Sequence, residues 1–86
     1  MTDLNQTNTI IRQLKEGKKI IVDDAINGEE LTYYFSDGKF WKERADTIVG
    51  AYRYKSELSI FEFIDELENI SRFELEASGF DIDPEK

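Results

Sequence analysis

The side chains of this sequence that could do chemistry are mostly carboxylates, and they gather in its last third. Between Glu57 and Lys86 there are ten acidic residues and two basic ones, which accounts for the whole formal net charge of −8. The residues before Glu57 carry equal numbers of acids and bases. Carboxylates bind metal ions or arginine side chains, and a one-signed field attracts basic partners and repels nucleic acid and anionic membranes. The charge pattern therefore favours a basic protein partner.

Other kinds of chemistry are limited because the sequence has no cysteine and no histidine. Thiolate nucleophiles, disulfides, the usual zinc ligands and the commonest general base are therefore absent. Two acidic groups could ligate magnesium or calcium, namely Asp23 with Asp24 and the run Asp81, Asp83 and Glu85. Neither has a glycine-bearing loop of EF-hand form, and neighbouring residues of a strand point to opposite faces. We expect no catalytic residue, no metal and no cofactor, and a protein that is not an enzyme.

The most regularly spaced acids are expected on one amphipathic helix. Ser59 and Glu62 match a capping box at its start. A helix over residues 60–70 has one apolar face, formed by Ile60, Phe63, Ile64, Leu67 and Ile70. Acids on the opposite face would be about 5–6 Å apart, a charge density comparable to a DNA strand with one phosphate per about 3.4 Å. The predicted acidic stripe consists of Glu62, Asp65 and Glu66, extended by Glu57, Glu68, Glu74 and Glu76.

The same stripe has an alternative interpretation as a solvated surface that keeps the protein soluble. Solvated helices usually intersperse acids with Lys or Arg in i,i+4 pairs, whereas basic residues are nearly absent here. Both interpretations remain open at this point.

A helix and a small sheet are predicted to precede the acidic helix. Leu4, Ile10, Ile11 and Leu14 recur at helical spacing, and Gly17 suits the position after the helix end. Three β-rich runs follow, over residues 19–26, 29–36 and 39–44. They are joined by Asn27-Gly28 and Asp37-Gly38, dipeptides that favour two-residue type I′ turns. The pattern predicts a three-stranded antiparallel meander.

Two-residue turns also imply which residues pair. They place Ile20 opposite Phe35 and Val22 opposite Tyr33 in the first hairpin. In the second hairpin they place Phe35 opposite Phe40 and Tyr33 opposite Lys42. The better candidate for the core is the sheet face formed by Ile20, Val22, Leu31, Tyr33, Phe35 and Phe40.

The other face of this sheet would carry a row of Ile21, Tyr34 and Trp41. This row could form a second small core beneath a loop or the tail, or it could bind a partner.

Two segments allow more than one structure. Asp46 or Thr47 can cap a short helical turn through Tyr52, although β-branched residues there also allow a fourth strand. Residues 71–77 favour a short helix through a Ser71 and Glu74 capping box, but they also alternate like a strand. Residues 79–86 are expected to form a loosely ordered acidic tail. We therefore predict a single α+β domain over residues 1–86: an N-terminal helix, a three-stranded antiparallel meander and one or two C-terminal helices (αβββαα).

The sequence resembles the small acidic anti-CRISPR proteins of phages that inhibit Cas9, one group of which has the order αβββαα at nearly this length. The resemblance covers most of residues 10–71. It rests on Ile10-Ile11-Arg12-x-x-Lys15, Asp37-Gly38, Ile48-Val49-x-x-Tyr52, and Phe63 followed by Ile70. In that group acidic residues occupy the site where Cas9 reads the PAM duplex, and the hairpin tip reaches toward the nuclease domain. The resemblance implies that Asp37 and Gly38 form the tip contact, and it implies arginine ligands at Glu57, Glu62, Asp65 and Glu66.

Together these observations predict a phage-type inhibitor that binds a protein with a basic DNA-binding groove, most specifically the Cas9–guide RNA complex, by mimicking DNA. No apolar run approaches the roughly 20 residues of a membrane span, and the polar start is unlike a signal peptide. We therefore expect a protein of the host cytoplasm that contacts neither nucleic acid nor membrane directly. The alternative is a regulatory interaction module that binds its partner through Ile21, Tyr34 and Trp41.

Overall fold

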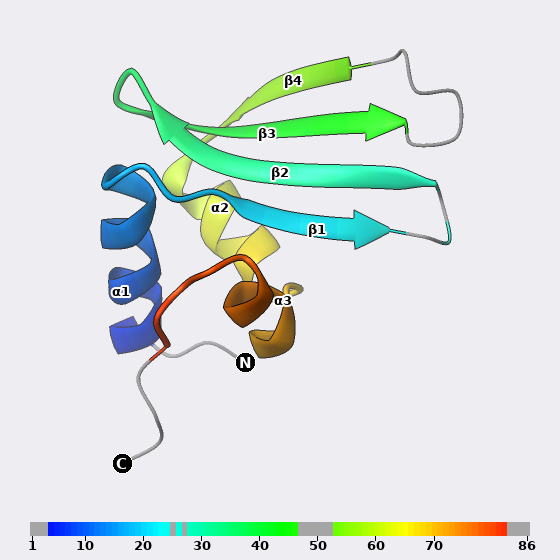
Figure 1. Cartoon of the computed structure of the whole chain (residues 1–86). Helices are drawn as coiled ribbons and strands as arrows, with labels where there is room; N and C mark the ends of the chain where they lie inside the picture. Colours follow the sequence, from blue (N-terminus) through cyan, green and yellow to red (C-terminus); the bar gives the residue numbers. More distant parts are fainter. Residues whose placement is uncertain (1–3, 25, 27, 47–52, 83–86) are drawn as a thin grey trace.

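One helix, a four-stranded antiparallel sheet and two short helices make up the fold (Figure 1). The computed structural model describes residues 4–24, 26, 28–46 and 53–82. The elements are α1 (Leu4–Lys15), β1 (Ile20–Asp24), β2 (Glu29–Ser36), β3 (Lys39–Asp46), β4 (Arg53–Leu58), α2 (Ile60–Leu67) and α3 (Arg72–Ala77). The strands lie in the order β1-β2-β3-β4. This confirms the α+β class with an N-terminal helix, an antiparallel meander and two C-terminal helices, and it adds one strand.

The fourth strand is the main departure from the predicted three-stranded meander. β4 pairs with β3, with Phe40 opposite Leu58 and Arg44 opposite Tyr54. Its sequence, Arg-Tyr-Lys-Ser-Glu-Leu, has no β-branched residue, so its own strand signal is weak and its conformation depends on pairing with β3. The helical turn expected from Asp46 or Thr47 to Tyr52 falls on residues outside the described part, except that Asp46 ends β3.

The β2–β3 hairpin forms as predicted. Asp37 and Gly38 have φ angles of 55° and 76°, the positive values that both central residues of a type I′ turn require. Phe35 lies opposite Phe40 and Tyr34 opposite Trp41. The turn dipeptide therefore predicted both the turn and the register correctly.

The register of the first hairpin differs from the prediction by two residues. Ile20 lies opposite Tyr33 rather than Phe35, and the last pair is Asp24 with Glu29. Four residues therefore connect β1 and β2, where a two-residue turn at Asn27-Gly28 was predicted. Because side chains alternate with a period of two, a shift of two residues keeps every side chain on its predicted face. The pairing was wrong, but the core face is the predicted one.

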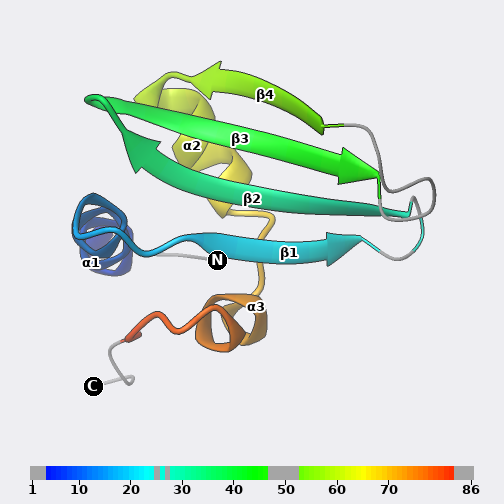
Figure 2. The same cartoon turned by 45° about the horizontal axis from the view of Figure 1, so that its top comes forward.

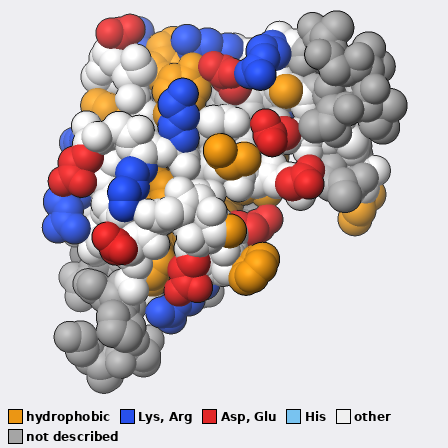
Figure 3. Space-filling model, in the orientation of Figure 1, with side chains coloured by type: hydrophobic (Ala, Val, Ile, Leu, Met, Phe, Trp, Pro, Cys, Tyr) orange, Lys and Arg blue, Asp and Glu red, His pale blue; other side chains and the backbone are white. Residues whose placement is uncertain are grey.

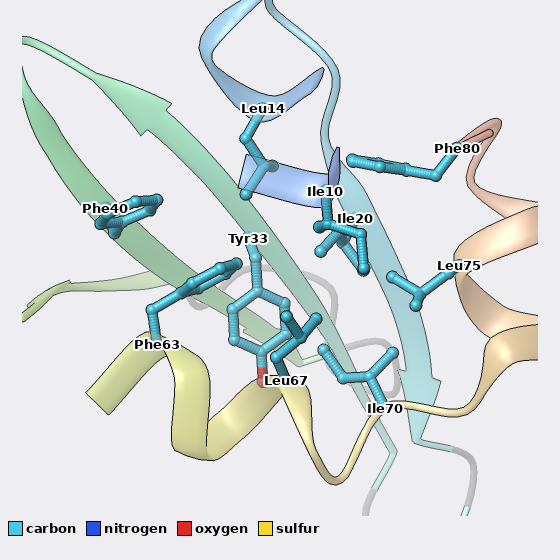
Figure 4. Packing of buried hydrophobic residues seen from close by; sticks show 10 residues of the cluster. All are labelled: Ile10, Leu14, Ile20, Tyr33, Phe40, Phe63, Leu67, Ile70, Leu75 and Phe80. Atoms are coloured by element: carbon cyan, nitrogen blue, oxygen red, sulfur yellow. The ribbon is translucent and has the colours of Figure 1, made fainter. Parts of the chain in front are cut away.

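All three helices lie on one side of the sheet (Figures 1 and 2), and their apolar side chains meet its inner face. The centre of the core is Phe63 of α2, which is 1% exposed. Its ring stacks on Phe40 at 4.7 Å between centroids and meets Tyr33 edge-on at 6.5 Å. The buried residues, shown in Figure 4, are Ile10, Leu14, Ile20, Tyr33, Phe40, Phe63, Leu67, Ile70, Leu75 and Phe80.

The chain after α3 is held more firmly than the predicted loose tail. Phe80 is buried in the core. The buried side-chain amide of Gln13 donates to the carbonyl oxygen of Asp81, and its oxygen accepts from the Asp81 N–H, both at 2.9 Å. Residues 79–82 are therefore fixed against α1, and residues 83–86 lie outside the described part. This contact joins residues 68 positions apart, which no local sequence pattern encodes.

The orientation of α2 is tested by two phenylalanines on opposite sides of it. Phe63→Ala should lower the free energy of unfolding by about 3–5 kcal/mol, because it removes a fully buried ring. Phe61 is 80% exposed, so Phe61→Ala should change stability by no more than about 0.5 kcal/mol. Urea denaturation of both variants measures the difference, and equal losses would contradict this orientation.

Candidate functional site

The start of α2 is held by reciprocal hydrogen bonds. The Ser59 hydroxyl accepts from the Glu62 N–H at 3.1 Å, and the Glu62 carboxylate accepts from the Ser59 N–H at 2.8 Å. This is the predicted capping box. Since the helix also buries Phe63 and Leu67 against the sheet, its rotation about its own axis is fixed. The opposite side of α2 is therefore a rigid surface.

That surface, which we call the α2 outer face, combines carboxylates with apolar side chains. It forms a shallow hollow of about 420 Å³, lined by Phe61, Glu62, Ile64, Asp65 and Glu68. The three acids are spaced by three residues, so they lie along one side of the helix. Glu62 contributes to the capping box, whereas the carboxylates of Asp65 and Glu68 have no cationic partner in the described part of the chain. These two charges are available to an outside partner.

Glu66 does not lie on the α2 outer face, where the sequence analysis placed it. It is three residues from Phe63, which turns its side chain toward the sheet. The Tyr33 hydroxyl donates to Glu66 Oε1 at 2.7 Å, and Lys42 Nζ donates to the same oxygen at 3.1 Å. Glu66 therefore joins α2 to β2 and β3 rather than facing a partner.

The electrostatics of this group favour a charged Glu66 and a neutral Tyr33. Burial alone would raise the pKa of Glu66, but the hydrogen bonds from Tyr33 and Lys42 outweigh burial and lower it. Burial strongly raises the pKa of the Tyr33 hydroxyl, and the hydrogen bond to the neighbouring carboxylate adds to this effect. The hydrogen bond between Tyr33 and Glu66 contributes to both shifts, and it is a contact within the structure.

The other predicted acids are also separated by the fold. Glu57 lies opposite Trp41, on the outer face of the sheet away from α2, and pairs with Lys39 at 3.6 Å. Glu74 completes a capping box with Ser71 at the start of α3. Glu76 pairs with Arg72 at 3.2 Å. The predicted acidic stripe is therefore not one surface, and only Glu62, Asp65 and Glu68 share the α2 outer face.

The hairpin tip at Asp37 and Gly38 is exposed. Because Phe40 lies opposite Leu58, which directly precedes Ser59, the tip is at the same end of the sheet as the start of α2.

On the side of the molecule shown in Figure 3, acidic and basic side chains are interspersed rather than gathered in one patch.

The predicted aromatic row is present only in part. Tyr34 lies opposite Trp41, but Ile21 lies opposite Thr32 and is outside the row because of the register shift. Lys55 Nζ lies 4.5 Å from the Trp41 ring centroid and 5.7 Å from that of Tyr34.

The polar atoms of both rings also have internal partners. Trp41 Nε1 donates to the Ser36 carbonyl oxygen at 3.0 Å, and the Tyr34 hydroxyl donates to Glu43 at 2.7 Å. Burial and this hydrogen bond raise the pKa of Tyr34, and the same bond lowers the pKa of Glu43. Lysine side chains lie over these rings.

Sequence reasoning missed Phe61 as a surface residue. Its position off the apolar stripe was a usable signal, since residue 61 is out of phase with residues 60, 63, 64 and 67. Ile60 was expected in the core, but it is 38% exposed at the first turn of α2.

Within the described residues, no three carboxylates converge on a point where a metal could bind. No described helix is long and apolar enough to cross a membrane. Comparison with protein-family models, with curated proteins and with solved structures found no match.

The inward position of Glu66 predicts a pH-dependent effect on stability. At about pH 7, Glu66→Gln should lower the free energy of unfolding by about 1–2 kcal/mol, because Lys42 loses its anionic partner. The loss is no larger because the Glu66 side chain is one-third exposed, so solvent screens the ion pair. The pKa of Glu66 is lowered on folding from 4.5, so this stabilisation is present above that value and is lost as the pH falls through the folded-state pKa. Urea denaturation at about pH 7 and about pH 3 should show the difference shrinking.

Asp65→Asn is the matched control, because it makes the same chemical change one residue away on the α2 outer face. It should alter stability by no more than about 0.5 kcal/mol at either pH. Equal destabilisation by both variants would mean that Glu66 does not face the sheet.

Proposed function

We propose that this chain is a non-enzymatic inhibitor that uses the α2 outer face to occupy the basic DNA-binding groove of a host protein. In its most specific form, the target is guide-loaded Cas9 at the site that reads the PAM, as the sequence resemblance implies. The observation that carries the proposal is the row of Glu62, Asp65 and Glu68 on a rigid helix, two of them without a cationic partner among the described residues.

The spacing of these carboxylates suits arginines that normally contact DNA. Residues three apart on a helix advance about 4.5 Å along its axis, compared with about 3.4 Å per phosphate along a DNA strand. PAM recognition uses arginines that make bidentate contacts to guanine, and a carboxylate offers a guanidinium the same bidentate geometry. Because α2 is fixed by its cap and by Phe63, little conformational entropy is lost when these acids bind.

The apolar residues of the α2 outer face distinguish it from a purely electrostatic mimic. Phe61 is highly exposed, and Ile64 lies beside it in the same hollow. A large exposed apolar side chain within a ring of charges is the usual composition of an interface anchor. In this proposal the acids align the arginines of the groove, and Phe61 fills an apolar recess that DNA does not use.

The fold also limits which other residues can take part. A partner seated on α2 reaches the hairpin tip at Asp37 and Gly38, which is at the same end of the sheet. It does not reach Glu57, which lies on the outer face of the sheet. We therefore assign the arginine contacts to Glu62, Asp65 and Glu68, and we leave Glu57, Glu66, Glu74 and Glu76 out of the interface.

The alternative function is binding through the outer face of the sheet. It is favoured by one observation: no described helix lies on that side of the sheet. The lysines above the rings and the internal hydrogen bonds of both polar atoms give these residues a structural role instead.

Target cleavage by a panel of guide-loaded Cas9 orthologues, with and without this protein, tests the proposal. At least one ortholog should be inhibited by the wild type. The variant Asp65→Lys with Glu68→Lys should weaken inhibition by at least roughly a hundredfold, because each reversal leaves an arginine of the groove facing a cation. Inhibition by the wild type should also weaken steeply with added salt.

The variant Glu16→Lys with Asp23→Lys is the control. It makes the same change in net charge at exposed positions away from α2, so it should inhibit like the wild type. If Trp41→Ala abolishes inhibition and the α2 variant does not, the sheet face is the binding surface. If no ortholog is bound or inhibited, the Cas9 assignment is wrong.

A further inference from the structure

The two edge strands of the sheet, β1 and β4, differ in whether another described element covers them. β1 forms one edge, and α3 covers it. The Ser78 hydroxyl accepts from the N–H of Ile21 at 2.9 Å, and its oxygen lies 3.2 Å from the Ile21 carbonyl oxygen. At Ile21, near the start of β1, a side chain thus takes the place of a neighbouring strand. An edge protected in this way does not recruit further strands.

β4 forms the other edge, and no described element lies beyond it. Every side chain of β4 is exposed or half-buried. The strand contains no proline, and its pairing with β3 runs without a bulge from Leu58 to Arg53. Edge strands present a row of backbone donors and acceptors that can pair with another strand. β4 is therefore the place where this sheet can be extended.

We propose that β4 pairs antiparallel with β4 of a second copy of this chain, about a two-fold axis through Ser56, to form one continuous eight-stranded sheet. A two-fold axis perpendicular to the sheet reverses the strand direction and keeps each side chain on its own face. Such an axis must pass through one residue position, which then lies opposite itself.

The charges of β4 select that position. The outer face of β4 carries two bases and then an acid, namely Arg53, Lys55 and Glu57. An axis at Lys55 would place two lysines opposite each other, and an axis at Glu57 would place two glutamates opposite each other. An axis at Ser56 places Lys55 opposite the partner's Glu57, and this pair occurs twice by symmetry. Opposite charges directly across a strand pair stabilise it, and like charges destabilise it.

The inner face supports the same axis. When Ser56 lies opposite the partner's Ser56, Tyr54 lies opposite the partner's Leu58. Tyr54 is 52% exposed and Leu58 half-buried, so each has apolar surface to lose. Aromatic and aliphatic side chains form favourable cross-strand pairs. Both faces of the strand therefore favour one register.

Charged side chains on an edge strand usually prevent pairing with foreign strands. In the proposed dimer, the charges of β4 disfavour the registers centred on Lys55 and Glu57 and favour the register centred on Ser56. The dimer also places both α2 helices on the same side of the extended sheet, since the axis does not exchange its faces.

Self-association of the full-length protein, measured by sedimentation velocity over a concentration series, tests the proposal. The wild type should shift from monomer to dimer, and not to larger species, as its concentration rises, because only one edge is open. Lys55→Glu and Glu57→Lys should each weaken the dimer by roughly tenfold or more, since each turns two opposite-charge pairs into like-charge pairs. The double variant should recover wild-type dimerisation, because it restores both pairs with their signs exchanged.

Each single variant also loses a contact within the monomer, since Lys55 lies over Trp41 and Glu57 pairs with Lys39. The double variant loses both contacts, so its recovery cannot come from repair of the monomer. A wild type that stays monomeric throughout, or a double variant as weak as the single ones, would overturn the proposal.

Cysteine crosslinking tests the register independently, because the chain has no cysteine of its own. Ser56→Cys should form an intermolecular disulfide under mild oxidation, since directly opposite residues have Cα atoms about 4.5–5.5 Å apart. Glu57→Cys should not, because the two copies of residue 57 would be about 8 Å apart, beyond disulfide reach. Equal crosslinking of both variants, or none at Ser56→Cys, would contradict this axis.

Discussion

The packing of Phe63 against Phe40 and Tyr33 determines how the helices and the sheet fit together. It holds α2 against the sheet and fixes which side of that helix faces inward. Once Phe63 is buried, Glu66 lies near Tyr33 and Lys42, which both donate hydrogen bonds to its Oε1 atom. Glu62, Asp65 and Glu68 are carried outward by the same rotation. The burial of Phe63 therefore turns Glu66 toward the sheet and leaves Glu62, Asp65 and Glu68 on the α2 outer face.

Much of the fold could be predicted from local signals. The two capping boxes mark the starts of α2 and α3, and Asp37-Gly38 determines both the turn and the register of its hairpin. What could not be predicted depends on contacts between distant residues. β4 becomes a strand because β3 offers it a pairing edge, and the chain after α3 is fixed because Gln13 of α1 bonds to Asp81.

The sequence correctly predicted the helix that carries the candidate site, but not which acidic residues share its outer face. Helical spacing alone placed Glu66 beside Glu62 and Asp65, because residue 66 lies at the boundary between the two faces. Its inward turn depends on Tyr33 and Lys42, which come from other strands. The charge excess of the last third is likewise not one patch. The fold uses Glu66, Glu74 and Glu76 in structural contacts, and it leaves Asp65 and Glu68 to face solvent beside Phe61.

Amide hydrogen exchange on the complex with an inhibited Cas9–guide RNA ortholog would show which surface of this protein is bound. If the α2 outer face is the binding surface, complex formation should slow exchange across α2 and at the tip around Asp37 and Gly38, and leave β1 unchanged. Slower exchange confined to the strands that carry Tyr34 and Trp41, with α2 unaffected, would mean that the α2 outer face is not the binding surface.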